Sequence, residues 1–183
     1  MLNLNTQRLN IRLAGPGEEG LILNFYLENQ NHLSQWDPEK SEEFYTEAYW
    51  FEKISSALEL ASEEKEFRFH LFLKETSELI GMCSVVNIER GPFQNCRLGY
   101  KISYKYEGQG LMSEALSEVI RFCFEDLRLH RIEANYIPTN NKSAALLERH
   151  HFEKYGIAKN YLKIAGRWQD HVLTCLINKD YID

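Results

Sequence analysis

Two glycines, Gly108 and Gly110, stand between an alternating strand pattern at 94–104 and an amphipathic helix pattern that begins at Met112. Glycine adopts backbone conformations that other residues avoid, and it lets the chain approach a ligand closely. The first amides of a helix have no intrahelical acceptor and carry partial positive charge. A glycine turn before a helix is therefore typical of an anion-binding loop, and a phosphate group is the expected ligand.

The same turn lacks the features of two common nucleotide-binding loops. A dinucleotide-binding turn needs a third glycine where this chain has Ser113, and a Walker loop ends in Gly-Lys followed by Ser or Thr. The pattern that remains is [Q/R/K]-x-x-G-x-G, which begins at Lys105. For this segment alone, a strand-to-helix connection that uses glycine only for its geometry is the alternative interpretation.

Two hydrophobic periods divide the rest of the chain into strands and helices. Apolar residues at every second position predict strands, and apolar residues three and four positions apart predict helices. The predicted strands are 6–13, 67–74, 79–88, 94–104, 130–137, 155–164 and 167–176, and the predicted helices are 18–29, 42–62, 112–127 and 140–149. This order has no repeat and no linker, and it predicts one α+β domain over 1–183, a mixed sheet flanked by helices.

Composition narrows the class of protein. A chain of 183 residues that is 44% hydrophobic can bury one full core. The net charge of −6 without a lysine or arginine cluster argues against direct nucleic-acid binding through a basic face. The acidic stretch at 39–66 is either a solvated helix face or a surface for a basic partner.

The same features bear on location and on metals. Four cysteines without C-x-x-C spacing, and no signal segment, indicate reduced thiols and a cytoplasmic protein. The apolar runs are too short to cross a membrane, and the six histidines show no metal-ligand spacing, so we expect neither a membrane span nor a metal site.

A second motif begins at Asn140, which follows the glycine loop after one predicted helix and one predicted strand. Alone, Asn140 is a typical helix N-cap. Here it opens the pattern N-x-x-S, whose serine is Ser143, ahead of a leucine-rich stretch and Phe152. With this second motif the chain resembles the GCN5-related N-acetyltransferases (GNAT), and among them the ribosomal-protein-alanine N-acetyltransferases of the RimJ and RimL type, RimJ most closely. Further matching segments are 6–13, 36–38, 90–91, 98–100, 110–112, 130–132, 134–136 and 161–162, followed by Gly166, Trp168 and 170–174.

The resemblance implies the acyl-CoA N-acyltransferase fold, with a mixed and mostly antiparallel sheet, and acetyl-CoA as cosubstrate. It implies direct acetyl transfer to the N-terminal alanine of the fifth protein of the small ribosomal subunit. The strand would hydrogen-bond the pantetheine, and the loop amides would hold the pyrophosphate. The residues implied for the cofactor are Ile102, Ser103, Tyr104, Lys105, Gly108, Gln109, Gly110, Leu111, Met112, Ser113 and Asn140.

Three positions depart from the family pattern. Leu147 stands where many members have a tyrosine acid, and Asn135 stands where some carry a glutamate base. His151 replaces the glycine that usually precedes Phe152. Histidine tolerates a positive φ better than most residues, so a left-handed helix cap can survive there.

The reaction makes modest demands on acid and base. An α-amine has a pKa of about 7.7–8.0, against about 10.4 for lysine, so part of it is neutral near pH 7. A strong base is therefore unnecessary. The leaving thiol, by analogy with cysteine at about 8.5, is also easily expelled. A weak acid is then sufficient, and the RimL-type pattern implies that Ser143 is this acid. Glu89 ranks first as base because it follows the third strand near the predicted cleft; the other candidates are Glu133, Asp170 and His171.

The sequence says less about the residues that bind the acceptor. Trp36, Tyr161 and Asp170 are expected to contact the acceptor in a groove, although core packing is the alternative for Trp36, Tyr161 and Trp168. Because the fold does not fix the acceptor, an acetyltransferase for a polyamine, an amino acid or an aminoglycoside is the second hypothesis. A non-catalytic acyl-CoA-binding module is the third. The sequence leaves the oligomeric state open.

Overall fold

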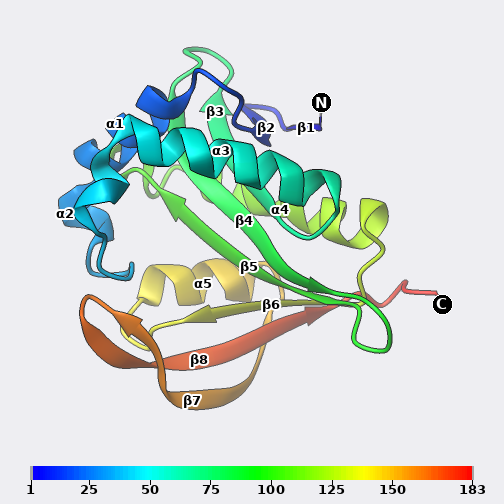
Figure 1. Ribbon diagram of the computed structural model, residues 1–183. Coiled ribbons are helices and arrows are strands. Elements are labelled where there is room, and N and C mark those ends of the chain that lie inside the picture. Colours follow the sequence, from blue (N-terminus) through cyan, green and yellow to red (C-terminus); the bar gives the residue numbers. More distant parts are fainter. Residues whose placement is uncertain (1, 183) are drawn as a thin grey trace.

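The computed structural model describes residues 2–182 and shows an eight-stranded sheet with helices on both faces (Figure 1). The strand order is β1-β2-β3-β4-β5-β6-β8-β7. The strands are β1 (Asn3–Asn5), β2 (Leu9–Leu13), β3 (Phe67–Leu73), β4 (Leu79–Glu89), β5 (Asn95–Ile102), β6 (Arg131–Tyr136), β7 (Glu153–Ile164) and β8 (Arg167–Ile177). The α-helices are α1 (Glu19–Glu28), α2 (Gln30–Leu33), α3 (Glu47–Ser62), α4 (Leu111–Arg121) and α5 (Asn141–Arg149). β5 and β6 are parallel and every other adjacent pair is antiparallel, so the expected mixed, mostly antiparallel sheet is confirmed.

Most predicted elements coincide with observed ones, and the differences have local causes. The predicted strand at 6–13 begins only at Leu9, because Thr6 turns the chain and its amide donates to the Leu9 carbonyl. The predicted helix at 42–62 is divided into a 3₁₀ turn, η1 (Glu42–Tyr45), and α3, because the Thr46 hydroxyl caps α3 by accepting from the Tyr49 amide. The helix predicted at 112–127 ends as the π-helical turn η3 (Phe122–Asp126).

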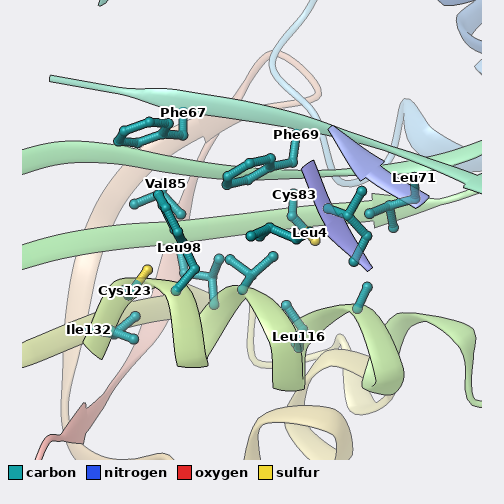
Figure 2. Close-up of a cluster of buried hydrophobic side chains, with 14 of the residues drawn as sticks. Leu4, Phe67, Phe69, Leu71, Cys83, Val85, Leu98, Leu116, Cys123 and Ile132 are labelled. Atoms are coloured by element: carbon teal, nitrogen blue, oxygen red, sulfur yellow. The ribbon is translucent and has the colours of Figure 1, made fainter. Parts of the chain in front are cut away.

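The main core lies between the sheet and α4. Side chains of a strand alternate between its two faces. Figure 2 shows Val85 and Leu98 extending from the sheet toward α4, where Leu116 lies; all three are buried. The Phe122 ring of η3 packs edge-on against Phe69, with ring centres 5.4 Å apart. A smaller cluster, which includes Ile22, Phe25, Ile54 and Met82, fills the opposite face beneath α1 and α3.

The sheet is split at one place, between β5 and β6. These strands pair only where Asn95–Arg97 meet Arg131–Glu133. Beyond that point, β5 stays with β4 as far as Ile102, and β6 stays with β8 as far as Tyr136, so the two strands diverge (Figure 1). Backbone groups along the two facing edges lose their sheet partners and become available to a ligand.

The four cysteines are free thiols, and each is buried. No helix among residues 2–182 combines the length and the apolar character needed to cross a bilayer.

Candidate active site

The glycine loop lies at one end of the split, between β5 and α4. Gly108 and Gly110 adopt the left-handed φ values of 73° and 76°, and Gly110 is the N-cap of α4. Within residues 2–182, the amides of Lys105 and of 108–113 donate to no protein acceptor. This row of free N–H groups at a helix N-terminus can bind a phosphate.

Contacts from the turn between β1 and β2 hold this loop in place. Glu114, in the first turn of α4, accepts from the Thr6 hydroxyl at 2.5 Å and from the Arg8 amide at 2.7 Å. The Arg8 guanidinium binds the same carboxylate at 2.6 Å and also donates to the Gln109 carbonyl at 3.0 Å. These contacts, which join distant parts of the chain, were not predicted from the sequence. They fix the loop before a ligand arrives and place a cation beside it.

A pair of hydroxyl groups joins the two sides of the split. The Tyr100 hydroxyl of β5 lies 2.7 Å from Oγ of Ser143 in the first turn of α5. Asn140 caps α5, since its Oδ1 accepts from the Ser143 amide at 3.0 Å. Burial raises the pKa of the Tyr100 phenol well above its usual range, so the phenol remains protonated. The pair can therefore deliver a proton into the cleft.

The next residue of β5 faces the other way. Nζ of Lys101 lies 2.5 Å from Oδ2 of Asp37 and 5.1 Å from the ring centre of Tyr26 on α1. The Asp37 carbonyl accepts from the Ala165 amide at 3.1 Å. This hydrogen bond joins residues 36–38, the Trp36 segment, to the turn between β7 and β8. The split thus has one face with hydroxyl groups and another face closed by two loops.

One continuous cleft of about 1640 Å³ connects these parts. Many of the residues predicted for the site line it: Trp36, Ile102, Tyr104, Gly108, Gly110, Leu111, Met112, Ser113, Asn140 and Ser143. Lys105 and Gln109 are not among the lining residues, but their backbone amides are part of the row of free N–H groups in the glycine loop.

The predicted pantetheine contacts need a correction at two residues. The Ser103 amide already donates to the Ile80 carbonyl at 2.8 Å, and the Tyr104 amide donates to Oδ1 of Asn29 at 3.1 Å. Neither amide is free for a ligand. The free edge of β5 lies earlier, at 98–102, where the strand has left β6.

The expectation that Glu89 lies near the cleft is wrong. Glu89 pairs with Asn95, at the end of β4 opposite to Gly81, the partner of Ile102. Because β4 runs antiparallel to β5, its last residue lies where β5 and β6 are still paired, and Glu89 does not line the cleft. We therefore do not propose Glu89 as the base.

Two other candidate bases are occupied by structural contacts outside the cleft. Glu133 binds Arg131 at 3.0 Å and accepts from the Tyr155 hydroxyl at 3.2 Å. Asp170 binds Lys159 at 2.6 Å on the β7–β8 hairpin, and the hydrogen bond from this lysine lowers the pKa of the carboxyl. Neither carboxylate lines the cleft, so the expected acceptor contact of Asp170 is not supported.

The predicted aromatic residues divide between the cleft and the hairpin. Trp36 lines the cleft, whereas Trp168 is 62% exposed and is not a core residue. The Tyr161 hydroxyl accepts from Nδ2 of Asn135 at 3.4 Å, and its ring lies 5.3 Å from that of His171, which does line the cleft. Tyr161 therefore reaches the cleft through its neighbours.

The departures from the family pattern have simple structural consequences. Leu147 is buried in the core one turn after Ser143, so the hydroxyl at this helix face comes from Ser143 alone. His151 adopts a φ of 62°, the left-handed cap that a glycine would otherwise supply.

The fold and the cleft define an acyl-CoA N-acyltransferase. A family model described as an acetyltransferase (GNAT) domain matches residues 8–153, and the chain belongs to this family.

Individual relatives narrow the comparison. The chain is 39% identical, over 180 residues, to the [ribosomal protein uS5]-alanine N-acetyltransferase of Escherichia coli K12, covering 98% of this chain and 93% of the relative. It is 34% identical to the probable N-acetyltransferase YjcK of Bacillus subtilis, covering 86% and 87%. The crystal structure of the ribosomal-protein-S5-alanine acetyltransferase from Vibrio fischeri superposes with a TM-score of 0.95 at 36% identity and covers all of both chains. The resemblance to the RimJ type is confirmed.

Proposed function

We propose that this acetyltransferase moves the acetyl group of acetyl-CoA to the α-amine of the N-terminal alanine of ribosomal protein uS5. The observation that carries the proposal is the 39% identity to the Escherichia coli enzyme of that name. Because this match covers 98% of the chain, it includes both the cofactor loop and the segments that close the acceptor side.

The geometry suits acetyl-CoA as the donor. The free amides of 108–113 would hold the pyrophosphate, and the unpaired edges of β5 and β6 would hydrogen-bond the pantetheine amides. A pantetheine arm that lies in the split would bring the thioester of acetyl-CoA to Tyr100 and Ser143.

The residues at the split would support direct transfer. The neutral α-amine attacks the thioester carbonyl carbon, a C–N bond forms as the amine gives one proton to a base or to water, and the C–S bond breaks. Free backbone N–H groups along the split can stabilise the carbonyl oxygen as negative charge develops on it. The departing thiolate takes a proton from Ser143, whose hydroxyl is held by Tyr100. The product is an acetylated N-terminus and CoA.

An acceptor panel tests the proposed function. CoA release is followed as free thiol with the alanine-initiated N-terminal peptide of uS5, with the same peptide blocked at its α-amine, and with a polyamine. We expect turnover only with the free α-amine. Turnover with the polyamine alone would overturn the proposed acceptor, and acetyl-CoA binding without any turnover would indicate a non-catalytic module.

Replacing Gly108 with alanine should weaken acetyl-CoA binding. Gly108 and Gly91 both have left-handed φ values, 73° and 71°, and an added Cβ would meet no atom within 4 Å at either position. The backbone strain of the two alanine variants is therefore similar, on the order of 1–2 kcal/mol. Only Gly108 belongs to the phosphate loop.

We expect Gly108→Ala to raise the Kd for acetyl-CoA by about tenfold in calorimetric titration, which corresponds to about 1.4 kcal/mol. Gly91→Ala, in the turn between β4 and β5, should leave the Kd unchanged. Equal Kd values for both variants would contradict the assignment of the loop.

A further inference from the structure

His171 of β8 has a fixed tautomer. Its side chain is buried, and its Nδ1 lies 3.1 Å from the carbonyl oxygen of Gln169. A carbonyl oxygen can only accept, so Nδ1 must carry the hydrogen. In the neutral ring, Nε2 then holds the lone pair. Within residues 2–182, Nε2 makes no hydrogen bond, and His171 lines the cleft.

The strand registers place His171 at the height of the hydroxyl pair. Arg97 pairs with Glu133 across β5 and β6, and Tyr136 pairs with Val172 across β6 and β8. When these registers are continued by a few residues, His171 falls level with Lys101, the neighbour of Tyr100. The imidazole and the Tyr100–Ser143 pair therefore lie at the same height along the split.

The two groups lie on opposite faces of the sheet. Val172 packs against the main core on the α4 side, as do the residues of α5 that follow Ser143. Because neighbouring residues of a strand point to opposite faces, His171 faces the side closed by the Trp36 segment and the β7–β8 turn. A proton donor on one face and a proton acceptor on the other suit a thioester held between them.

We propose that His171 is the general base of the acetyl transfer, an assignment that rests on the proposed function. Nε2 takes the proton that the α-amine loses as the C–N bond forms, directly or through one water. The C–S bond breaks, and the thiolate takes its proton from Ser143. His171 then returns its proton to solvent, and Ser143 is reprotonated from solvent, so the step balances without a further reactant.

The groups nearest to His171 come from β6, β7 and β8. β7 contributes the Tyr161 phenol, at a ring separation of 5.3 Å, and β6 contributes the uncharged amide of Asn135. On β8 itself, the neighbouring Asp170 carboxylate is held by Lys159.

His171→Asn separates the base from a structural role. The asparagine amide can still donate to the Gln169 carbonyl, but it offers no basic nitrogen at the position of Nε2. We expect kcat/KM for the uS5 peptide to fall about 100-fold at pH 7, with unchanged Tm and unchanged Kd for acetyl-CoA. The loss should shrink at alkaline pH, because hydroxide can then take the proton of the attacking amine in place of the imidazole. His130→Asn, at the far end of the sheet, should match the wild type.

Two results would overturn the assignment: an unchanged kcat/KM, or a loss that is equal at every pH. A measurement independent of the acceptor is ¹⁵N NMR of the imidazole, in which we expect the proton on Nδ1; a proton on Nε2 would refute the proposal. Failure of the uS5 acceptor is detected separately, in the wild-type enzyme. The pH comparison can then use whichever amine the wild type acetylates.

Discussion

Replacing Ser143 with alanine is expected to lower kcat by about 10²–10⁴-fold, the usual contribution of a general acid. The substitution removes the hydroxyl that lies 2.7 Å from that of Tyr100, so the leaving thiolate loses its nearest proton donor. The pyrophosphate loop is untouched, and the Kd for acetyl-CoA should stay within about twofold. Steady-state kinetics with the uS5 peptide, together with calorimetric titration of acetyl-CoA, measure both quantities.

A matched variant separates chemistry from folding. Ser55→Ala removes the hydroxyl of an exposed helical serine that donates to the Phe51 carbonyl at 3.0 Å, and should leave kcat unchanged. The Tyr100 hydroxyl loses its partner in Ser143→Ala, which can lower the free energy of unfolding by about 1 kcal/mol. A Ser143→Ala enzyme that keeps kcat within about threefold of the wild type would show that the proton comes from elsewhere.

Gly81→Ala is expected to have the largest effect on stability. A Cβ at Gly81 would lie 2.6 Å from the carbonyl oxygen of Lys101 and 3.2 Å from Cδ1 of Leu71. The first of these atoms is backbone in the β5 edge of the split, so it can yield only if the strand shifts. Overpacking of this kind lowers the free energy of unfolding by about 1–3 kcal/mol. The shift should also lower kcat, because Tyr100 precedes Lys101.

Gly99→Ala is the control, since Gly99 lies in the partner strand and an added Cβ there would meet no atom within 4 Å. Its free energy of unfolding, measured in urea, should equal or slightly exceed that of the wild type, because alanine loses less backbone entropy than glycine in a strand. Equal stability of Gly81→Ala and Gly99→Ala would refute the close packing of β4 on β5.

The parts of the fold and site that could be predicted are those that local sequence determines. The hydrophobic periodicity and the turn residues identified nearly every helix and strand. Gly108 and Gly110 marked the phosphate loop, because a left-handed backbone favours glycine. Asn140 was predicted as an N-cap, and it is one, because a cap acts within a single turn.

What the sequence could not predict depends on pairing between distant segments. Glu89 was misplaced because the distance of a strand end from the cleft follows from register, which periodicity does not give. The contact of Tyr100 with Ser143 was missed because it crosses the split, and the split arises where β5 stops pairing with β6. His171 was a candidate from its residue type alone, whereas its tautomer follows from the contact with Gln169.

Tandem mass spectrometry of the uS5 N-terminal peptide, after incubation with the enzyme and acetyl-CoA, tests acetyl transfer to the α-amine most directly. The peptide should carry its alanine and an internal lysine, both free. We expect a single acetyl group on the alanine nitrogen and none on the lysine. An acetyl group on the lysine alone, or an unmodified peptide with an enzyme that binds acetyl-CoA, would contradict the proposed function.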